Sequence, residues 1–132
     1  MTKTTGAMPA SPTFEIQIVL RERDYAISEH VALPGPAERA PSEWTDQDVE
    51  YILKEILLAI DRAKNPGGEP RFVALRGFSW IVEPVAEGGV VIAIEIPMGA
   101  AVAGPFAIDQ PSLDRMVRRV LAAASPARPV VH

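Results

Sequence analysis

Residues 13–33 read TFEIQIVLRERDYAISEHVAL, and this stretch decides the class of the fold. Apolar and polar side chains alternate through its first part, which is the period of a half-buried strand. A polar turn over 21–24 leads into a second alternating run. Pairing Leu20 with Tyr25 gives both runs one shared apolar face, so the stretch predicts an antiparallel hairpin. The facing pairs in this register are Phe14 with Val31, Ile16 with Glu29 and Ile18 with Ile27.

Two helices are predicted from apolar side chains spaced by three and four residues. The first begins after Thr45, a good N-cap residue, and ends at the Pro-Gly-Gly stretch 66–68. The second begins after Asp109 and keeps its apolar spacing as far as Leu121. Each helix follows a region that is rich in strand-forming residues.

A second hairpin is predicted from 71–84 and 90–97, with Ala86 opposite Val90 and a glycine-containing turn. The apolar phase changes within the first of these strands, so we expect a β-bulge at Arg76–Gly77. The small residues of 98–105 predict a loop. This loop contains the Gly99–Gly104 stretch, which lacks the ending of a phosphate-binding loop.

These elements predict an α+β fold: a four-stranded antiparallel sheet of two β-hairpins, with two helices packed on one face, in the order ββα-ββα. Residues 13–124 form one domain, between a flexible N-terminal tail (1–12) and a flexible C-terminal tail (125–132). The two halves align at an offset of 64, which places Phe14 on Phe78. An internal duplication is therefore possible, although few residues are identical.

The composition excludes several classes of protein. A net charge of −4 disfavours a nucleic-acid partner, and no apolar run has the length of a membrane span. The 132 residues include no cysteine and two histidines, which removes the usual nucleophiles and metal ligands. We therefore expect no metal and no cofactor. The lack of thiols is typical of a cytoplasmic protein.

Glu29 is the one weak candidate for a catalytic residue. The hairpin register places its carboxyl on the buried face, opposite Ile16, and burial of this kind can produce a general acid. Arg76 is then its most plausible partner. The alternative is that Glu29 lies at the rim of the sheet with its carboxyl group in water.

Glu29, Arg76 and Trp80 together are the candidate ligand-binding residues. Their pocket would lie between the sheet and the Gly99–Gly104 loop, because aromatic and charged side chains converge in small-molecule sites. The alternative is that Trp80 belongs to the hydrophobic core.

Apolar side chains on the outer surface predict an interface. The strand period turns several of them outward, around Glu83 and Glu95, and others fall on the polar side of the first helix. An exposed apolar patch of this kind usually marks an interface, so a homodimer is expected. The candidate interface residues are Ile81, Val91, Ala93, Tyr51 and Leu58.

Three functions remain open at this stage. The sequence favours a non-enzymatic interaction or assembly protein that acts through an apolar sheet face as a homodimer, or with another protein. The second hypothesis is a small-molecule binding domain. The third is an enzyme that uses Glu29 as acid or base and Arg76 to hold an anion.

Overall fold

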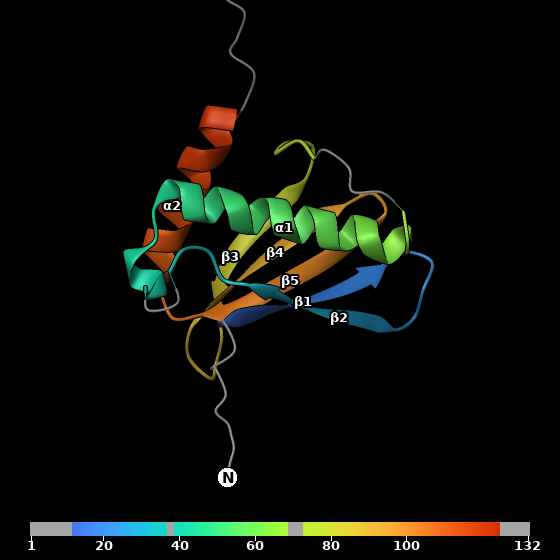
Figure 1. The fold of residues 1–132 in the computed structure, drawn as a ribbon, viewed down its shortest axis with the longest axis horizontal. Helices are drawn as coiled ribbons and strands as arrows, with labels where there is room; N and C mark the ends of the chain where they lie inside the picture. The colour runs from blue at the N-terminus through green and yellow to red at the C-terminus, as the bar shows by residue number, and fades with distance from the viewer. Residues whose placement is uncertain (1–11, 37–38, 69–72, 125–132) are drawn as a thin grey trace, which may run out of the picture.

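A computed structural model describes residues 12–36, 39–68 and 73–124 (Figure 1). Both predicted tails lie outside the described residues, except for Pro12, whose carbonyl accepts a hydrogen bond from the Leu33 amide. The elements of the described part are β1 (Thr13–Leu20), β2 (Ala26–Ala32), a short 3-10 helix (Pro41–Glu43), α1 (Asp46–Lys64), β3 (Ser79–Pro84), β4 (Val90–Ile96), β5 (Gly99–Phe106) and α2 (Gln110–Ala124).

The α+β class and the antiparallel sheet are confirmed, but the sheet has five strands in the described residues rather than four. Its order is β2-β1-β5-β4-β3, and every pair of neighbours is antiparallel. The predicted loop over 98–105 is wrong because most of it forms β5, the central strand. Ala101 and Ala103 of β5 are fully buried. Their small side chains let α1 pass close to the middle of the sheet.

The β-bulge lies in β5 and not at Arg76–Gly77. Between the pairs Val90↔Phe106 and Ile92↔Ala103, β5 contains one residue more than β4. The extra length falls at Gly104–Pro105, where the φ of Gly104 is +122° and proline can be accommodated without losing a ladder hydrogen bond. Arg76 and Gly77 precede β3, so no strand is present there to be bulged.

The first hairpin has the predicted register, residue for residue, including Ile16 opposite Glu29. The second hairpin is shifted by two residues, since Pro84 rather than Ala86 lies opposite Val90. A shift of two keeps the same side chains on the same face. Trp80 and Val82 therefore share a face with Ile92 and Ile94, as the apolar pattern predicts.

Both helices pack on the same face of the sheet: α1 contacts β1 and β5, and α2 contacts α1 and β3. In Figure 1, α1 crosses in front of the strands and α2 lies at the left. α1 begins with a capping box. The Thr45 side chain accepts a hydrogen bond from the Asp48 amide, and the Asp48 carboxylate accepts one from the Thr45 amide. The buried Asp48 carboxylate also accepts a hydrogen bond from Arg39 Nη2 at 2.8 Å. At the start of α2, Asp109 accepts a hydrogen bond from the Ser112 amide at 2.9 Å.

The core fills the space between the helices and the inner face of the sheet. Its largest fully buried side chains are Ile16, Ile18, Ile52, Leu53, Ile56, Ile60, Ile92, Ile94 and Leu113. Phe106 closes one end of this core, with ring-centroid distances of 5.3 Å to Phe14 and 5.1 Å to Trp44. These contacts hold the end of β5 to the first strand and to the segment before α1.

The topology does not repeat between the two halves. At an offset of 64, β1 corresponds to β3 and α1 begins at the position corresponding to the start of α2. However, β1 lies inside the sheet whereas β3 is an edge strand, and β5 has no counterpart in the first half of the described chain. Shared patterning therefore accounts for the sequence match better than duplication. Neither described helix is long and apolar enough to cross a membrane.

Candidate functional site

One face of the sheet is left uncovered by the helices, and we call it the open face. It lies on the side of the strands away from α1 and α2 in Figure 1. The exposure of alternate residues and the strand register identify its members. The open face consists of Glu15, Gln17, Val19, Ser28, His30, Ser79, Ile81, Glu83, Val91, Ala93, Glu95, Ala100 and Val102.

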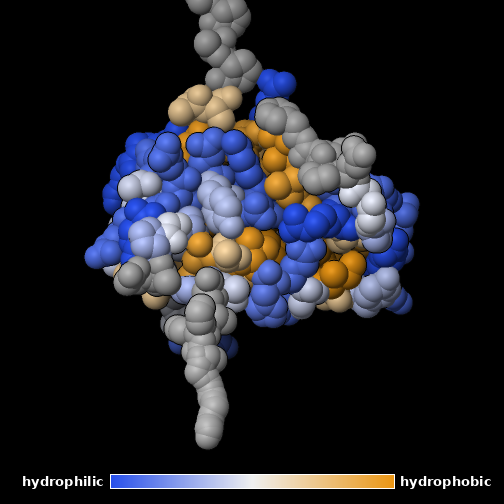
Figure 2. Space-filling view, in the orientation of Figure 1, coloured by the Kyte–Doolittle hydropathy of each residue, from blue (hydrophilic) through white to orange (hydrophobic). Residues whose placement is uncertain are grey.

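Apolar side chains occupy the middle of the open face. Four large hydrophobic residues are exposed in the described chain, and three of them lie here: Val19 at 48%, Ile81 at 49% and Val102 at 43%. Ile81 pairs with Ala93, which in turn pairs with Val102, so these residues form a row across three strands. Figure 2 shows the helix-covered side, where apolar side chains are visible between hydrophilic ones.

The charges on the open face are acidic. Glu15, Glu83 and Glu95 all project from it. Glu83 lies opposite Val91, and Glu95 follows four residues later on the same strand as Val91. At about 3.3 Å per residue, the two carboxylates are about 13 Å apart along the sheet, too far to share a proton or a metal ion. Among the described residues, no cluster of three acidic or histidine side chains could hold a metal.

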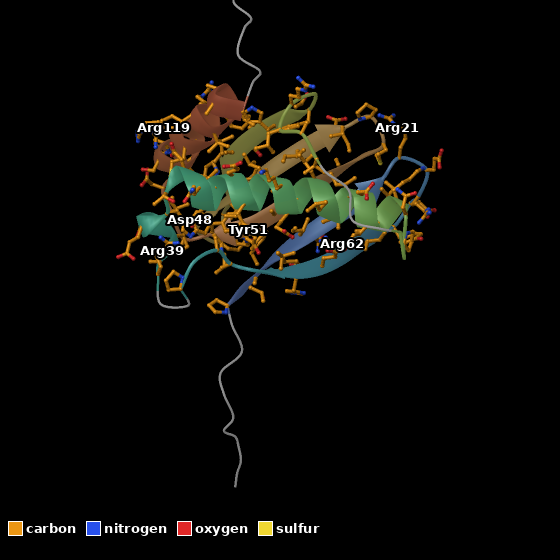
Figure 3. All side chains as sticks on the ribbon, turned by 45° about the horizontal axis from the view of Figure 1, so that its top comes forward. Arg21, Arg39, Asp48, Tyr51, Arg62 and Arg119 are labelled. Atoms are coloured by element: carbon orange, nitrogen blue, oxygen red, sulfur yellow. The ribbon has the colours of Figure 1, made fainter. Side chains whose placement is uncertain are left out.

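Arg21 provides positive charge at one end of the open face. It follows Val19 at the end of β1, and its Nε donates a hydrogen bond to the Pro97 carbonyl at 2.7 Å. It borders a shallow hollow together with Ser79 and Glu95. Figure 3 shows Arg21 at the opposite end of the molecule from Arg39 and Arg119.

The predicted interface residues fall on two separate surfaces. Ile81, Val91 and Ala93 belong to the open face, whereas Tyr51 and Leu58 lie on α1, across the sheet. The Tyr51 hydroxyl donates a hydrogen bond to the Ala32 carbonyl at 2.8 Å, which ties α1 to the end of β2. Burial, and secondarily the Glu55 carboxylate, raise the pKa of Tyr51. Tyr51 is therefore a neutral structural contact at physiological pH.

Glu29 lies on the inner face of the edge strand β2, as the register predicts, but its partner is Arg62 of α1 and not Arg76. Arg62 Nη2 donates to Glu29 Oε1 at 2.6 Å, and Arg62 Nε lies 3.2 and 3.3 Å from the two carboxylate oxygens. The hydrogen bond to Glu29 raises the pKa of Arg62. A charged residue that points inward from an edge strand discourages pairing with another chain. The ion pair with Arg62 therefore explains why a carboxylate lies on the inner face of β2.

Contacts from α2 protect the opposite edge strand, β3, from pairing with another strand. The Gln110 side chain donates a hydrogen bond to the Val82 carbonyl at 3.2 Å. The Arg118 guanidinium lies 5.4 Å from the ring centroid of Trp80. Trp80 is partly buried and packs against the core. These contacts from α2 leave the open face, rather than the β3 edge, as the accessible apolar surface of the sheet.

The three candidate ligand-binding residues are not brought together. Glu29 lies on β2, Trp80 lies on β3 at the other edge of the sheet, and Arg76 precedes β3. Arg76 instead borders a cleft of about 300 Å³ beside α1. The cleft is lined by Leu57, Asp61, Val73, Ala74, Arg76, Ile96 and Met98. The expected wall formed by a Gly99–Gly104 loop is absent because those residues form the central strand.

Val19, Ala100 and Val102 are not among the predicted interface residues. Sequence reasoning misses Ala100 and Val102 because the composition of 98–105 predicts a loop. A weak signal is present, since Val102 alternates with the small residues Ala101 and Ala103 in the period of a strand.

Comparison of this chain with protein-family models, curated proteins and solved structures found no match.

Proposed function

We propose that this protein is a non-enzymatic assembly protein whose subunits associate as a homodimer through the open face. The observation that carries the proposal is the row Ile81–Ala93–Val102, with Val19 beside it, on a sheet surface that no element of the described chain covers. Apolar residues grouped in this way usually mark an interaction surface.

The composition of the open face favours a second protein surface over nucleic acid. Its carboxylates would repel phosphates, and the whole chain has a net charge of −4. The small side chains Ala93 and Ala100 allow a second sheet to approach closely. The protected edges favour association face to face rather than edge to edge. The cytoplasm is the proposed location, since the chain has no cysteine to form disulfides.

The size of the face predicts a dimer of moderate affinity. Five strands at about 4.8 Å spacing and about seven residues each give a footprint of about 550 Å². A standard interface buries about 800 Å² on each partner. Burying the exposed half of Ile81 contributes about 1 kcal/mol per subunit. We expect a dissociation constant in the micromolar range.

The proposal is tested by native mass spectrometry and by light scattering after size-exclusion chromatography, over a wide concentration range. Ile81→Glu should raise the dissociation constant at least about 100-fold, because it removes apolar contact and buries a carboxylate in both subunits. Ala122→Glu is the matched control, since Ala122 is exposed on α2. A monomeric wild-type protein, or an Ile81→Glu variant that dimerises like the control, would contradict the proposal.

A small-molecule binding domain is the alternative, and the cleft beside Arg76 favours it. Its lining is mainly apolar, with one cation and one carboxylate among the side chains. The same native mass spectra decide between the two proposals. A reproducible small-mass adduct that Arg76→Ala abolishes would support the alternative.

A further inference from the structure

We infer that protonation of His30 strengthens association through the open face, so that the homodimer is tighter at about pH 5.5 than at about pH 7.5. This inference rests on the proposed homodimer and adds its regulation. It follows from the charges that the open face carries and from the position of His30 among them. It does not depend on how the second copy is oriented.

Acidic side chains dominate the charge of the open face. Glu15, Glu83 and Glu95 project from it, and Arg21 lies at one end. While His30 is neutral, these three carboxylates and one guanidinium give the face a net charge of −2. Protonation of His30 changes this net charge to −1.

A homodimer formed through one face brings like charges together. In a two-fold dimer both subunits contribute the same surface, whatever the direction of the axis. The repulsion between two faces varies with the product of their net charges. This product falls about fourfold when His30 gains a proton in both subunits. Association is therefore weaker while His30 is neutral.

His30 lies beside an acidic side chain of its own subunit. It is exposed on the edge strand β2, directly opposite Glu15 of β1. Facing residues of this kind have Cβ atoms about 5 Å apart. The Gln17 side chain donates a hydrogen bond to Glu15 Oε2 at 3.2 Å, which holds the carboxylate on the open face. The pair His30–Glu15 therefore belongs to the surface that the second copy covers.

The other ionisable groups packed against β2 lie on its inner face. β1 is the only strand of the described chain that pairs with β2. α1 contacts β2 from the inner side, where Arg62 is paired with Glu29 and is also attracted by Glu55. The Tyr51 hydroxyl is on the same side, hydrogen-bonded to the Ala32 carbonyl. Glu15 is thus the charged group that faces His30 from β1.

His30 can gain a proton in the dimer at little cost in hydration. It lies at the edge of the sheet, near the polar residues Gln17 and Ser28, so its ring stays close to water at the rim of the interface. Histidine ordinarily changes its charge between pH 5 and pH 8, whereas glutamate and arginine keep theirs over this range. By linkage, a dimer that is tighter when His30 is protonated takes up protons as it forms.

Sedimentation equilibrium in about 20 mM NaCl tests the inference, because low salt leaves the charges weakly screened. Lowering the pH from about 7.5 to about 5.5 should lower the dissociation constant about tenfold, or about threefold for each of the two histidines. His30→Gln remains neutral at both pH values, so its dissociation constant should change by less than about twofold. His132→Gln is the matched control, because it removes the other histidine of the chain and should keep the tenfold change.

A fixed charge gives a second measurement. His30→Lys is charged at both pH values, so at about pH 7.5 its dissociation constant should be within about threefold of the wild-type value at about pH 5.5. Raising the NaCl concentration to about 500 mM should reduce the wild-type change to below about threefold, since salt screens these charges. Circular dichroism checks that each protein is folded at both pH values.

The outcomes separate the inference from the proposed function. A wild type that is monomeric at both pH values overturns the two together. A dimer whose dissociation constant changes by less than about twofold, or rises at the lower pH, overturns the inference and leaves the dimer standing. A tightening that His30→Gln retains also overturns the inference, because another group then takes up the proton. A tightening that is lost in His30→Gln and kept in His132→Gln supports it.

Discussion

The Glu29–Arg62 pair offers the sharpest test of how the fold protects its edge. Glu29 is 25% exposed and Arg62 is 46% exposed, so the pair lies between a surface ion pair and a buried one. Surface pairs contribute up to about 1 kcal/mol, and loss of one partner from a buried pair costs about 3–5 kcal/mol. After allowance for solvent screening, we expect Arg62→Leu to lower the free energy of unfolding by about 1 kcal/mol. In a domain of this size that change lowers the Tm by about 4 °C.

Replacing both partners should have a different effect from replacing one. The Glu29→Leu/Arg62→Leu protein leaves no unpaired charge, so its free energy of unfolding should be within about 0.5 kcal/mol of the wild type. It should also associate more readily at high concentration, because the inward charge no longer protects β2.

Urea unfolding followed by tryptophan fluorescence, analysed as a double-mutant cycle, measures the coupling energy of this pair. Trp44 and Trp80 are the natural probes, because the first is buried in the core and the second packs against it. Dynamic light scattering measures the change in association. Additive effects of the two single variants would refute the pairing. Unchanged scattering by the double variant would refute edge protection.

Three further predictions concern the framework. Asp48→Ala should destabilise the protein by about 2 kcal/mol in urea unfolding, because it removes the capping box of α1; an effect below about 0.5 kcal/mol would contradict this. Gly99→Ala should lower the Tm, since a Cβ atom there would lie 2.6 Å from a backbone oxygen of β1. Gly68→Ala is the control, and it should lower the Tm less, because the nearest atom to its Cβ is 3.2 Å away in a turn. Equal decreases in Tm would argue against the close approach at Gly99. The hydrogen bond from Arg119 lowers the pKa of Asp46, so its stabilising effect is fully present above the unfolded pKa of about 4 and is lost as the pH falls through the lowered pKa of the folded state. Arg119→Gln should therefore have a lower Tm than the wild type at pH 7, and the difference should shrink as the pH is lowered below about 4; a difference that stays constant with pH would disprove the linkage.

Local patterns in the sequence predict those parts of the fold that local physics determines. The hairpin over 13–33 follows from alternation and a short turn, and the start of α1 follows from Thr45 and Asp48 at capping positions. β5 is not predicted from the sequence because its composition is that of a loop. Gly99, the alanines and Pro105 have low strand propensity, and only the tertiary position between β1 and β4 makes small residues favourable there.

The candidate site likewise contains positions that local sequence patterns predict and contacts that they do not. Outward positions on the predicted strands, such as Ile81 and Ala93, can be identified from the strand period alone. The partner of Glu29 cannot, because Arg62 is 33 residues away on a helix whose position over the sheet depends on β5. The helical pattern also places Tyr51 on the polar side of α1, whereas its hydrogen bond to the Ala32 carbonyl holds it against β2.

The central position of β5 has a consequence for synthesis on the ribosome. β1 pairs with β5 through contacts such as Ile16↔Ala103, so one long side of the first hairpin stays without its neighbour until residue 103 has been made. At about 5–20 residues per second, the intervening stretch of about 87 residues takes about 4–17 s. During that interval the apolar face of β1 and the first helix form without the rest of the core. The apolar side chains of β1 are therefore without most of their native contacts for those seconds.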